Sequence, residues 1–353
     1  MSSLQSLTPS VPPSLRPRVS FIIPLYNCLA LSRGMLASLQ ATLPAGLAHE
    51  IIFIDDGSTD GTREWLKTLS PSNGLQTLSP SNGLATRHDA TIRVLLNERN
   101  LGYAVSNNRA AATARGDFLV LLNDDLVLLP RWLEPMLAAH ARLRQRAGVV
   151  GNVQLDASTG EVDHAGLVVN ITGKPVHARA LPSLAYRAIR RIRDVPAVTG
   201  ACLLIERSLW QHLGGFDEAY VNGGEDIELC FRARAAGRRN VVALRSVVHH
   251  HVSSSPGRKL RDEENSYRLA RRWARELVAA ADDGTRTWCR DYLAAQLLIP
   301  RSREYRLAIA AWAFLAHVRT TPPAEAVLAV EAGLRGEFAR WEEMFGGFRG
   351  AKT

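Results

Sequence analysis

Apolar strands that end in polar clusters are the feature of this sequence that most restricts its fold. The run LVLLNDDLVLLP (119–130) carries an Asn-Asp-Asp triplet at its centre, EIIFI (50–54) is followed by two aspartates, and TIRVLL (91–96) by an amide-rich stretch. Near-continuous apolar strands that alternate with helical patterns are typical of a parallel sheet covered on both faces. In such open sheets, ligands bind beyond the carboxyl ends of the strands. We therefore predict an α/β fold with one polar, ligand-binding rim.

The alternation of strands and helices divides the chain into regions. It runs from residue 19 to about 255, and the chain beyond shows helical patterns alone. We expect one α/β domain at 19–255, a helical C-terminal region at 256–353, and a disordered tail at 1–18, where Pro and Ser are frequent. The segment 68–90 contains the tandem repeat TLSPSNGLQ–TLSPSNGLA, which we interpret as a loop insertion because two copies cannot build a solenoid.

The charge of the chain restricts its partners. The formal net charge of +9 and the isoelectric point of about 9.8 favour anionic partners such as nucleotides, phospholipid surfaces or nucleic acid. No nucleic-acid module such as a paired zinc motif is recognisable, and we expect no nucleic-acid partner. The four cysteines form no Cys-x-x-Cys pair, which indicates a reducing compartment. The sequence carries no indication of the oligomeric state.

The sequence predicts no transmembrane segment. The apolar run at 307–318 is too short to span a bilayer, and the N-terminus lacks the basic-then-apolar pattern of a signal peptide. Residues 305–319, with Trp312 flanked by arginines, suit a helix at a membrane surface, although a core-packing helix explains the pattern equally well. We therefore expect a cytoplasmic protein, with peripheral association at the inner face of the plasma membrane as an open alternative.

The adjacent acids Asp124 and Asp125 indicate a cation site. Two carboxylates at one rim repel each other unless a cation or a donor-rich ligand lies between them. Oxygen ligands suit Mg²⁺ or Mn²⁺, which also bridge the oxygens of a diphosphate. The alternative is that the pair only caps the following turn. Because three strand ends bring polar residues to the same rim, the cation site is the better interpretation.

A second acidic pair opens the predicted helix in GGEDIELCFRARAAG (223–237). Glu225 and Asp226 lie in its first turn, where acids also stabilise the helix dipole without any further role. The two glycines before them let the backbone approach a ligand closely. One of these acids is a candidate general base, which requires a pKa near the working pH.

Three histidines follow the last predicted strand in VVHHHVSSS (247–255). Alternation along a strand sends His249 and His251 to one face and His250 to the other. A histidine run on a surface usually has no role, but this one ends a strand of a domain already expected to bind a metal. We predict one metal ligand here, and the residues alone leave open which of the three it is.

Together these segments resemble the family 2 glycosyltransferases, which have the GT-A nucleotide-sugar-binding fold. The matching stretches are VSFIIPLYN (19–27), FIDDGSTDGT (53–62), NERNLGYAVSNNRAAATARGDFLVLLNDD (97–125), VTGACLLIERSLWQHLGGFDEAYVNGGEDIELCFRARAAG (198–237) and the histidine segment. The rhamnosyltransferase-like branch, which builds bacterial surface polysaccharides and glycolipids, is the most similar. The resemblance implies metal-dependent, inverting transfer from a nucleoside-diphosphate sugar to a hydroxyl of a saccharide or lipid-linked saccharide.

The resemblance also implies roles for individual residues. Donor contacts would come from Pro24, Tyr26, Asp55, Asp56, Asn100, Gly102, Asn108 and Asp124. The Mg²⁺ or Mn²⁺ ligands would be Asp125 and His249, and the catalytic base Asp226 with Glu225 beside it. Acceptor contacts would come from Thr199, Gly200 and Ala201. The chain departs from the family pattern at Asn123, where the family has an acid. It also departs at Leu269, where processive members carry Gln. Because of this second departure, we expect the addition of one sugar per encounter.

Two other functions are weighed against this one. A sugar nucleotidyltransferase would use the same fold, but such enzymes carry a Gly-rich and basic triphosphate loop after the first strand, and PLYNCLALSRG has none. A non-catalytic basic protein that binds nucleic acid or membranes would explain the net charge and would show no sugar-nucleotide chemistry.

Overall fold

The computed structural model describes residues 18–69, 91–170, 172–182, 187, 190–251, 261–281, 304 and 324–349. The N-terminal tail, nearly all of the duplicated insertion and the apolar segment 305–319 lie outside the described residues, so the interpretations of these segments stay predictions. Within the described ranges, no helix is long and apolar enough to cross a membrane.

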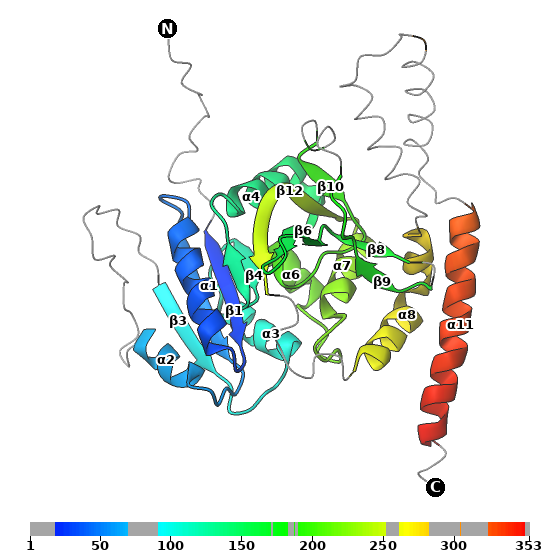
Figure 1. Cartoon of the computed structure of the whole chain (residues 1–353), viewed down its shortest axis with the longest axis horizontal. Coiled ribbons are helices and arrows are strands. Elements are labelled where there is room, and N and C mark those ends of the chain that lie inside the picture. The colour runs from blue at the N-terminus through cyan, green and yellow to red at the C-terminus, as the bar shows by residue number, and fades with distance from the viewer. Residues whose placement is uncertain are drawn as a thin grey trace.

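Among the described residues, a ten-stranded sheet forms the centre of the molecule, in the order β10-β12-β6-β11-β4-β1-β2-β3, with β5 beside β12 and β7 beside β6 (Figure 1). Its strands are β1 (Val19–Leu25), β2 (His49–Asp55), β3 (Thr91–Leu96), β4 (Phe118–Leu122), β5 (Leu126–Leu128), β6 (Ala147–Asp156), β7 (Val162–His164), β10 (Ile192–Asp194), β11 (Cys202–Glu206) and β12 (Arg239–His250). A separate hairpin joins β8 (Leu167–Val169) and β9 (Pro175–His177).

The long strands of the sheet mostly run parallel. β1 pairs in parallel with β2 and β4, β2 with β3, and β12 with β6. β11 runs antiparallel between β4 and β6, and the shorter strands at the far edge are antiparallel too. The predicted α/β fold with a mostly parallel sheet is confirmed, and the sheet is mixed because β11 separates its two parallel parts.

Helices cover both faces of the sheet because successive side chains of a buried strand point to opposite faces. In β2, Ile51 and Phe53 pack with α1, α2 and α4, whereas Ile52 and Ile54 pack with α3, α6 and α7. These helices are α1 (Leu29–Thr42), α2 (Thr62–Leu69), α3 (Tyr103–Thr113), α4 (Leu133–Leu143, followed by a 3-10 turn at Arg144–Arg146), α6 (Arg207–Leu213) and α7 (Glu225–Ala235). The layers leave the carboxyl ends of β1, β2 and β4 on a common rim.

Two helices outside this three-layer body, α8 (Asp262–Ala279) and α11 (Ala324–Arg349), lie side by side at one end of the molecule (Figure 1). They share a third apolar cluster with α7, in which Phe231 of α7 packs with Trp273 of α8 and Trp341 of α11. The expected helical C-terminal region is therefore present in its described part, and it is docked on the sheet domain through α7.

A buried carboxylate ties three elements of the sheet domain together. Glu50 of β2 is 2% exposed and accepts hydrogen bonds from Ser20 Oγ at 2.7 Å and from the Arg115 amide at 2.6 Å. A guanidinium nitrogen of Arg93 lies 3.2 Å from its second oxygen. Burial alone would raise the pKa of Glu50, but these hydrogen bonds and Arg93 hold the pKa below its ordinary value. Glu50 thus fixes the connection between α3 and β4 against β1 and β2.

We expect Glu50→Gln to lower the free energy of unfolding by about 2 kcal/mol at pH 7, because it weakens hydrogen bonds to a charged group. Since the pKa of Glu50 in the folded state lies below the unfolded value of about 4.3, its contribution is present above that pH and is lost as the pH falls through the lower folded-state pKa. Urea unfolding at several pH values measures both effects. Glu64→Gln, at an exposed acid of α2, is the control. If the difference in the free energy of unfolding between Glu50→Gln and wild type stays the same in acid, this account is wrong.

Candidate active site

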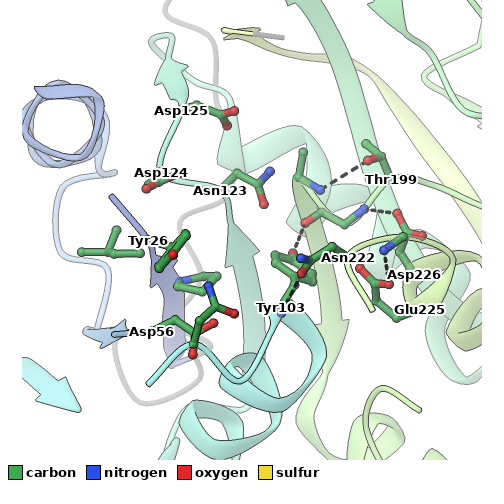
Figure 2. A pocket seen from close by; sticks show the side chains of 16 residues that line it. Tyr26, Asp56, Tyr103, Asn123, Asp124, Asp125, Thr199, Asn222, Glu225 and Asp226 are labelled. Atoms are coloured by element: carbon green, nitrogen blue, oxygen red, sulfur yellow. Dashed lines mark hydrogen bonds between the residues drawn. The ribbon is translucent and has the colours of Figure 1, made fainter. Parts of the chain in front are cut away.

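A cavity of about 320 Å³ opens at the carboxyl ends of β1 and β4 (Figure 2). Stretches far apart in the sequence line it: Pro24, Leu25, Tyr26, Asp56, Asn100, Tyr103, Asn123, Asp124, Asp125, Thr199, Gly200, Ala201, Asn222, Gly223, Glu225 and Asp226. This is the rim at which the strand pattern predicts ligand binding. Most of the candidate site residues named from the sequence are therefore brought together in one place.

The acids of the cavity stand on two sides of it. In Figure 2, Asp56 and Asp124 lie on one side with Tyr26, whereas Glu225 and Asp226 lie on the other. The first group comes from the ends of β1, β2 and β4, and the second from the first turn of α7. A ligand in the cavity is therefore in reach of carboxylates from opposite directions.

The carboxylate of Asp124 carries charge that the protein compensates poorly. It accepts one side-chain hydrogen bond, from Ser32 Oγ at 3.2 Å. Burial, and next the neighbouring Asp125, raise the pKa of Asp124 to about 7. Burial and the same two acids raise the pKa of the nearby Cys28 thiol to about 11. This corner of the cavity thus favours a positively charged or donor-rich ligand.

The donor set of this corner fits a hard divalent cation. Asp124 and Asp125 offer carboxylate oxygens of the kind that Mg²⁺ and Mn²⁺ take. The side-chain oxygen of Asn123 is buried and has no hydrogen-bond partner among the described residues. In the part of the chain that the structure describes, no group of three or more His, Cys, Asp and Glu side chains could hold a metal by itself. A cation here would complete its coordination with water or phosphate oxygens, as Mg²⁺ commonly does.

His250 lies beside Asp125 in this corner, whereas the resemblance implied His249 as the metal ligand and the residues alone left the choice among the three histidines open. β12 extends to His250, whose Nε2 lies 3.3 Å from Asp125 Oδ1 and whose Nδ1 lies 3.6 Å from Asp163 Oδ2. Successive side chains of a strand point to opposite faces, so only one of the two adjacent histidines can face Asp125. Burial alone would lower the pKa of His250, but Asp125 and Asp163 raise it to about 9.

Backbone amides hold Asp226 on the other side of the cavity. The Gly200 amide donates to Asp226 Oδ2 at 2.6 Å, and the Ile227 amide donates to Oδ1 at 2.8 Å. The Gly200 carbonyl in turn accepts a hydrogen bond from the Tyr103 hydroxyl at 2.8 Å. The predicted acceptor-side stretch and the predicted base are thus joined directly, and both line the cavity.

Three further residues of the predicted donor group stand behind the cavity wall. Asp55 is fully buried, and its carboxylate accepts hydrogen bonds from Arg63 at 2.9 and 3.0 Å. Asn108 holds the backbone of Phe216 through hydrogen bonds of 2.9 Å in both directions. The Gly102 amide is bound to Asp56. In this structure, these three residues shape the elements that carry the site and do not line the cavity, so their donor contacts stay predictions.

Asp56 organises the loop between β3 and α3. Its Oδ1 accepts hydrogen bonds from Asn97 Nδ2 at 2.7 Å and from the Leu101 amide at 2.8 Å, and its Oδ2 accepts one from the Gly102 amide at 2.9 Å. Asp56 therefore links the end of β2 to the loop that delivers Asn100 to the cavity. Asp55 and Asp56 are neighbours in the sequence, yet the strand points them toward different partners.

Two lining residues were missed by the sequence analysis, Tyr103 and Asn222. The Tyr103 amide donates to Asn222 Oδ1 at 3.2 Å, so these residues close one side of the cavity together. Each lies next to a motif that the sequence analysis used, since Tyr103 follows the Asn-Leu-Gly stretch and Asn222 precedes the two glycines before Glu225. Their position beside these glycine-containing turns is the sequence signal that could have identified both residues.

Comparison with known sequences places these features in a family. A model of the family described as glycosyl transferase family 2 matches residues 20–214. The chain is 34% identical over 250 residues to the uncharacterized protein y4gI of Sinorhizobium fredii, and the match covers 68% of this chain and 25% of that protein. It is 35% identical over 251 residues to the O-antigen biosynthesis protein RfbC of Myxococcus xanthus, and the match covers 68% of this chain and 18% of that protein. The chain thus spans about a quarter or less of the length of these two relatives.

A third relative and a solved structure complete the comparison. The chain is 28% identical over 229 residues to an N-acetylglucosaminyl-diphospho-decaprenol L-rhamnosyltransferase of Mycobacterium tuberculosis, covering 59% of this chain and 68% of that protein. The crystal structure of GalNAc-T7 with UDP, GalNAc and Mn²⁺ matches with a TM-score of 0.56 at 18% identity, over 85% of this chain and 55% of that chain. This likeness shows that the chain has the GT-A fold predicted from its sequence.

Replacing Asp56 by Asn would leave amide hydrogens facing backbone N–H groups, and we expect it to lower stability by about 1–3 kcal/mol. Hydrogen exchange at the Leu101 and Gly102 amides should become faster, since both lose a carboxylate acceptor. Glu98→Gln, at an exposed acid of the same loop, should leave exchange at these amides unchanged. Equal protection of both amides in wild type and Asp56→Asn would show that the carboxylate does not hold this loop.

Proposed function

The chain belongs to glycosyl transferase family 2, and on this premise we propose that it transfers a sugar from a nucleoside-diphosphate sugar to an acceptor hydroxyl, with inversion of the anomeric carbon. The observation that carries the proposal is the division of one cavity between two acidic groups. Asp124 and Asp125 lie at the strand ends, and Asp226 lies at the start of α7. Direct displacement requires the leaving group and the base on opposite sides of the sugar, which this division supports.

The donor binds, in our proposal, on the side of the strand ends. Tyr26, which is 42% exposed, offers a ring at the mouth of the cavity beside Pro24, where a nucleoside base could pack. Asp124 and Asp125 would hold Mg²⁺ or Mn²⁺, with His250 as the histidine beside them. Such a cation, when bound, would neutralise negative charge on the leaving diphosphate.

Asp226 is the proposed general base. A sugar hydroxyl is a weak nucleophile, so a carboxylate must accept its proton as the new bond forms. The amides of Gly200 and Ile227 fix the orientation of the Asp226 carboxylate, and Gly200 itself lines the cavity. Thr199 and Ala201 continue the same wall, so we place the acceptor there, next to the base.

Glu225 has a different role in this proposal, although it neighbours Asp226. It is 5% exposed, and its Oε2 accepts a hydrogen bond from the Gly223 amide at 2.8 Å. That bond folds the preceding turn onto the helix. We therefore assign Glu225 to holding the turn and Asp226 to the chemistry.

The relatives suggest the setting of the reaction. One is named an O-antigen biosynthesis protein and another a rhamnosyltransferase acting on a diphospho-decaprenol acceptor. We propose that this chain likewise adds one sugar at a time to a saccharide or lipid-linked saccharide of a bacterial envelope. The net charge of +9 suits work beside an anionic lipid surface, where a lipid-linked acceptor would be presented.

We expect Asp226→Asn to slow transfer by about 10²- to 10⁴-fold, the usual contribution of a general base, while the affinity for the nucleotide is retained. Product formation by mass spectrometry and nucleotide binding by calorimetry measure the two quantities separately. Glu264→Gln, which removes the same charge at an exposed position of α8, is the control. Turnover of Asp226→Asn close to wild type would remove Asp226 from the role of base.

We expect nucleoside diphosphates to raise the melting temperature of the protein in the presence of Mn²⁺, and Asp125→Ala to abolish this metal-dependent shift. A ligand at 100 times its Kd stabilises a protein by about 2.7 kcal/mol, which a thermal-shift assay resolves. Asp226→Asn should keep the shift, since it lies on the other side of the cavity. A full Mn²⁺-dependent shift in Asp125→Ala would place the metal elsewhere. Synthesis of a sugar nucleotide from a nucleoside triphosphate and a sugar phosphate would instead identify a nucleotidyltransferase.

A further inference from the structure

The turn that leads into the acidic pair is held from outside by a residue of α8. Asn265 is 6% exposed, and its Nδ2 donates to the Val221 carbonyl at 2.9 Å while its Oδ1 lies 3.4 Å from the Val221 amide nitrogen that donates to it. The carboxamide thus pairs with both backbone groups of one residue, much as a neighbouring strand would. Asn265 lies beyond the family match, which ends at residue 214.

The turn itself has a backbone conformation that requires such support. Asn222 has a φ of 53° and Gly224 a φ of 93°, both in the left-handed region that residues other than glycine rarely adopt. Conformations of this kind persist only where surrounding contacts determine them. Asn222 is fixed on one side by the Tyr103 amide, and Val221 is fixed on the other by Asn265. Besides the bond from the Gly223 amide to Glu225, the turn is thus held by contacts from two distant parts of the chain.

The rest of α8 is attached to the segments on either side of this turn. Arg272 Nη1 lies 3.2 Å from Oδ2 of Asp217, which precedes the turn. The same nitrogen lies 3.1 Å from Oε1 of Glu228, which follows the turn. The aromatic rings of Phe231 and Trp273 pack with their centroids 5.8 Å apart. α8 is thus attached to the segments on both sides of the turn at points other than Asn265.

We propose that Asn265 is a positioning residue for glycosyl transfer: through Val221 it sets the turn that closes the acceptor side of the cavity and aims Asp226. This inference rests on the proposed function, in which Asp226 is the base. Asn222 and Gly223 of the turn line the cavity, and Asp226 follows within a few residues. The residues proposed to hold the cation and the nucleoside, Asp124, Asp125 and Tyr26, come from the strand ends rather than from this turn. Loss of Asn265 therefore changes the transfer step and the use of acceptor, and leaves donor binding intact.

The test compares Asn265→Ala and Asn265→Asp with wild type. We expect Asn265→Ala to lower kcat by about 10- to 100-fold, because a displacement of about 1 Å at a reacting group costs that much, with unchanged affinity for the nucleoside diphosphate and Mn²⁺. Asn265→Asp keeps the acceptor for the Val221 amide, so its kcat should lie between those of Asn265→Ala and wild type. Hydrogen exchange of the Val221–Gly224 amides should quicken in the same order. If Asn265→Ala folds poorly, Asn265→Asp and its exchange pattern carry the test.

Leu269→Ala is the matched control. Leu269 is 3% exposed, lies one turn further along α8 and packs in the third apolar cluster. Both proteins are assayed well below their melting temperatures. If Leu269→Ala lowers kcat as much as Asn265→Ala, Asn265 only stabilises α8 and the inference fails. It also fails if Asn265→Ala keeps wild-type kcat while Asp226→Asn is inactive. An active Asp226→Asn would overturn the proposed function, and the inference with it.

Discussion

Backbone amides that hold carboxylates in place are the interaction on which the cavity depends. The carboxyl rim of the sheet gathers several acids, and like charges at close range repel each other. Asp56 is held by the amides of Leu101 and Gly102, and Asp226 by those of Gly200 and Ile227. The bonds to Asp56 and the bond between Gly200 and Asp226 also join segments that are far apart in the sequence. The acids that repel one another are therefore also the points at which the site is assembled.

Asp124 differs from these acids, because burial and the neighbouring Asp125 raise its pKa although Ser32 and backbone groups donate hydrogen bonds to it. With a pKa of about 7, this carboxyl group is ionised only in part near neutral pH unless a ligand supplies positive charge. A protein tolerates such a carboxylate where a ligand supplies what the backbone does not. Asp124 and Asp125 on one side and the well-anchored Asp226 on the other thus differ in environment, in the way that a cation site and a base site would differ.

The helical C-terminal region is part of the same construction. α8 lies outside the three-layer body, yet Asn265 and Arg272 bind the segment that runs from Asp217 to Glu228. The turn before Glu225, part of which lines the cavity, is therefore held by residues from both regions of the chain.

Much of the fold and part of the site could be predicted from local patterns. The alternation of apolar strands and helices predicted the α/β fold, because each strand carries its own burial pattern, as β2 does with Ile51 and Phe53 on one face and Ile52 on the other. The same patterns predicted the rim where Asp124 and Asp125 stand. The antiparallel direction of β11 was not predictable, because an apolar run such as CLLI can form a buried strand in either direction.

The sequence by itself determined which residue types stand at the strand ends, since burial along a strand and its termination are local properties of the chain. Only the tertiary structure decided which of two neighbours lies at the site: Asp56 rather than Asp55 lines the cavity, and the ring of His250 lies beside Asp125. Adjacent residues of a strand point to opposite faces, and the packing of neighbouring elements determines which face holds the ligand. The pairing of Asn265 with Val221 was decided in the same way, because it depends on where α8 docks.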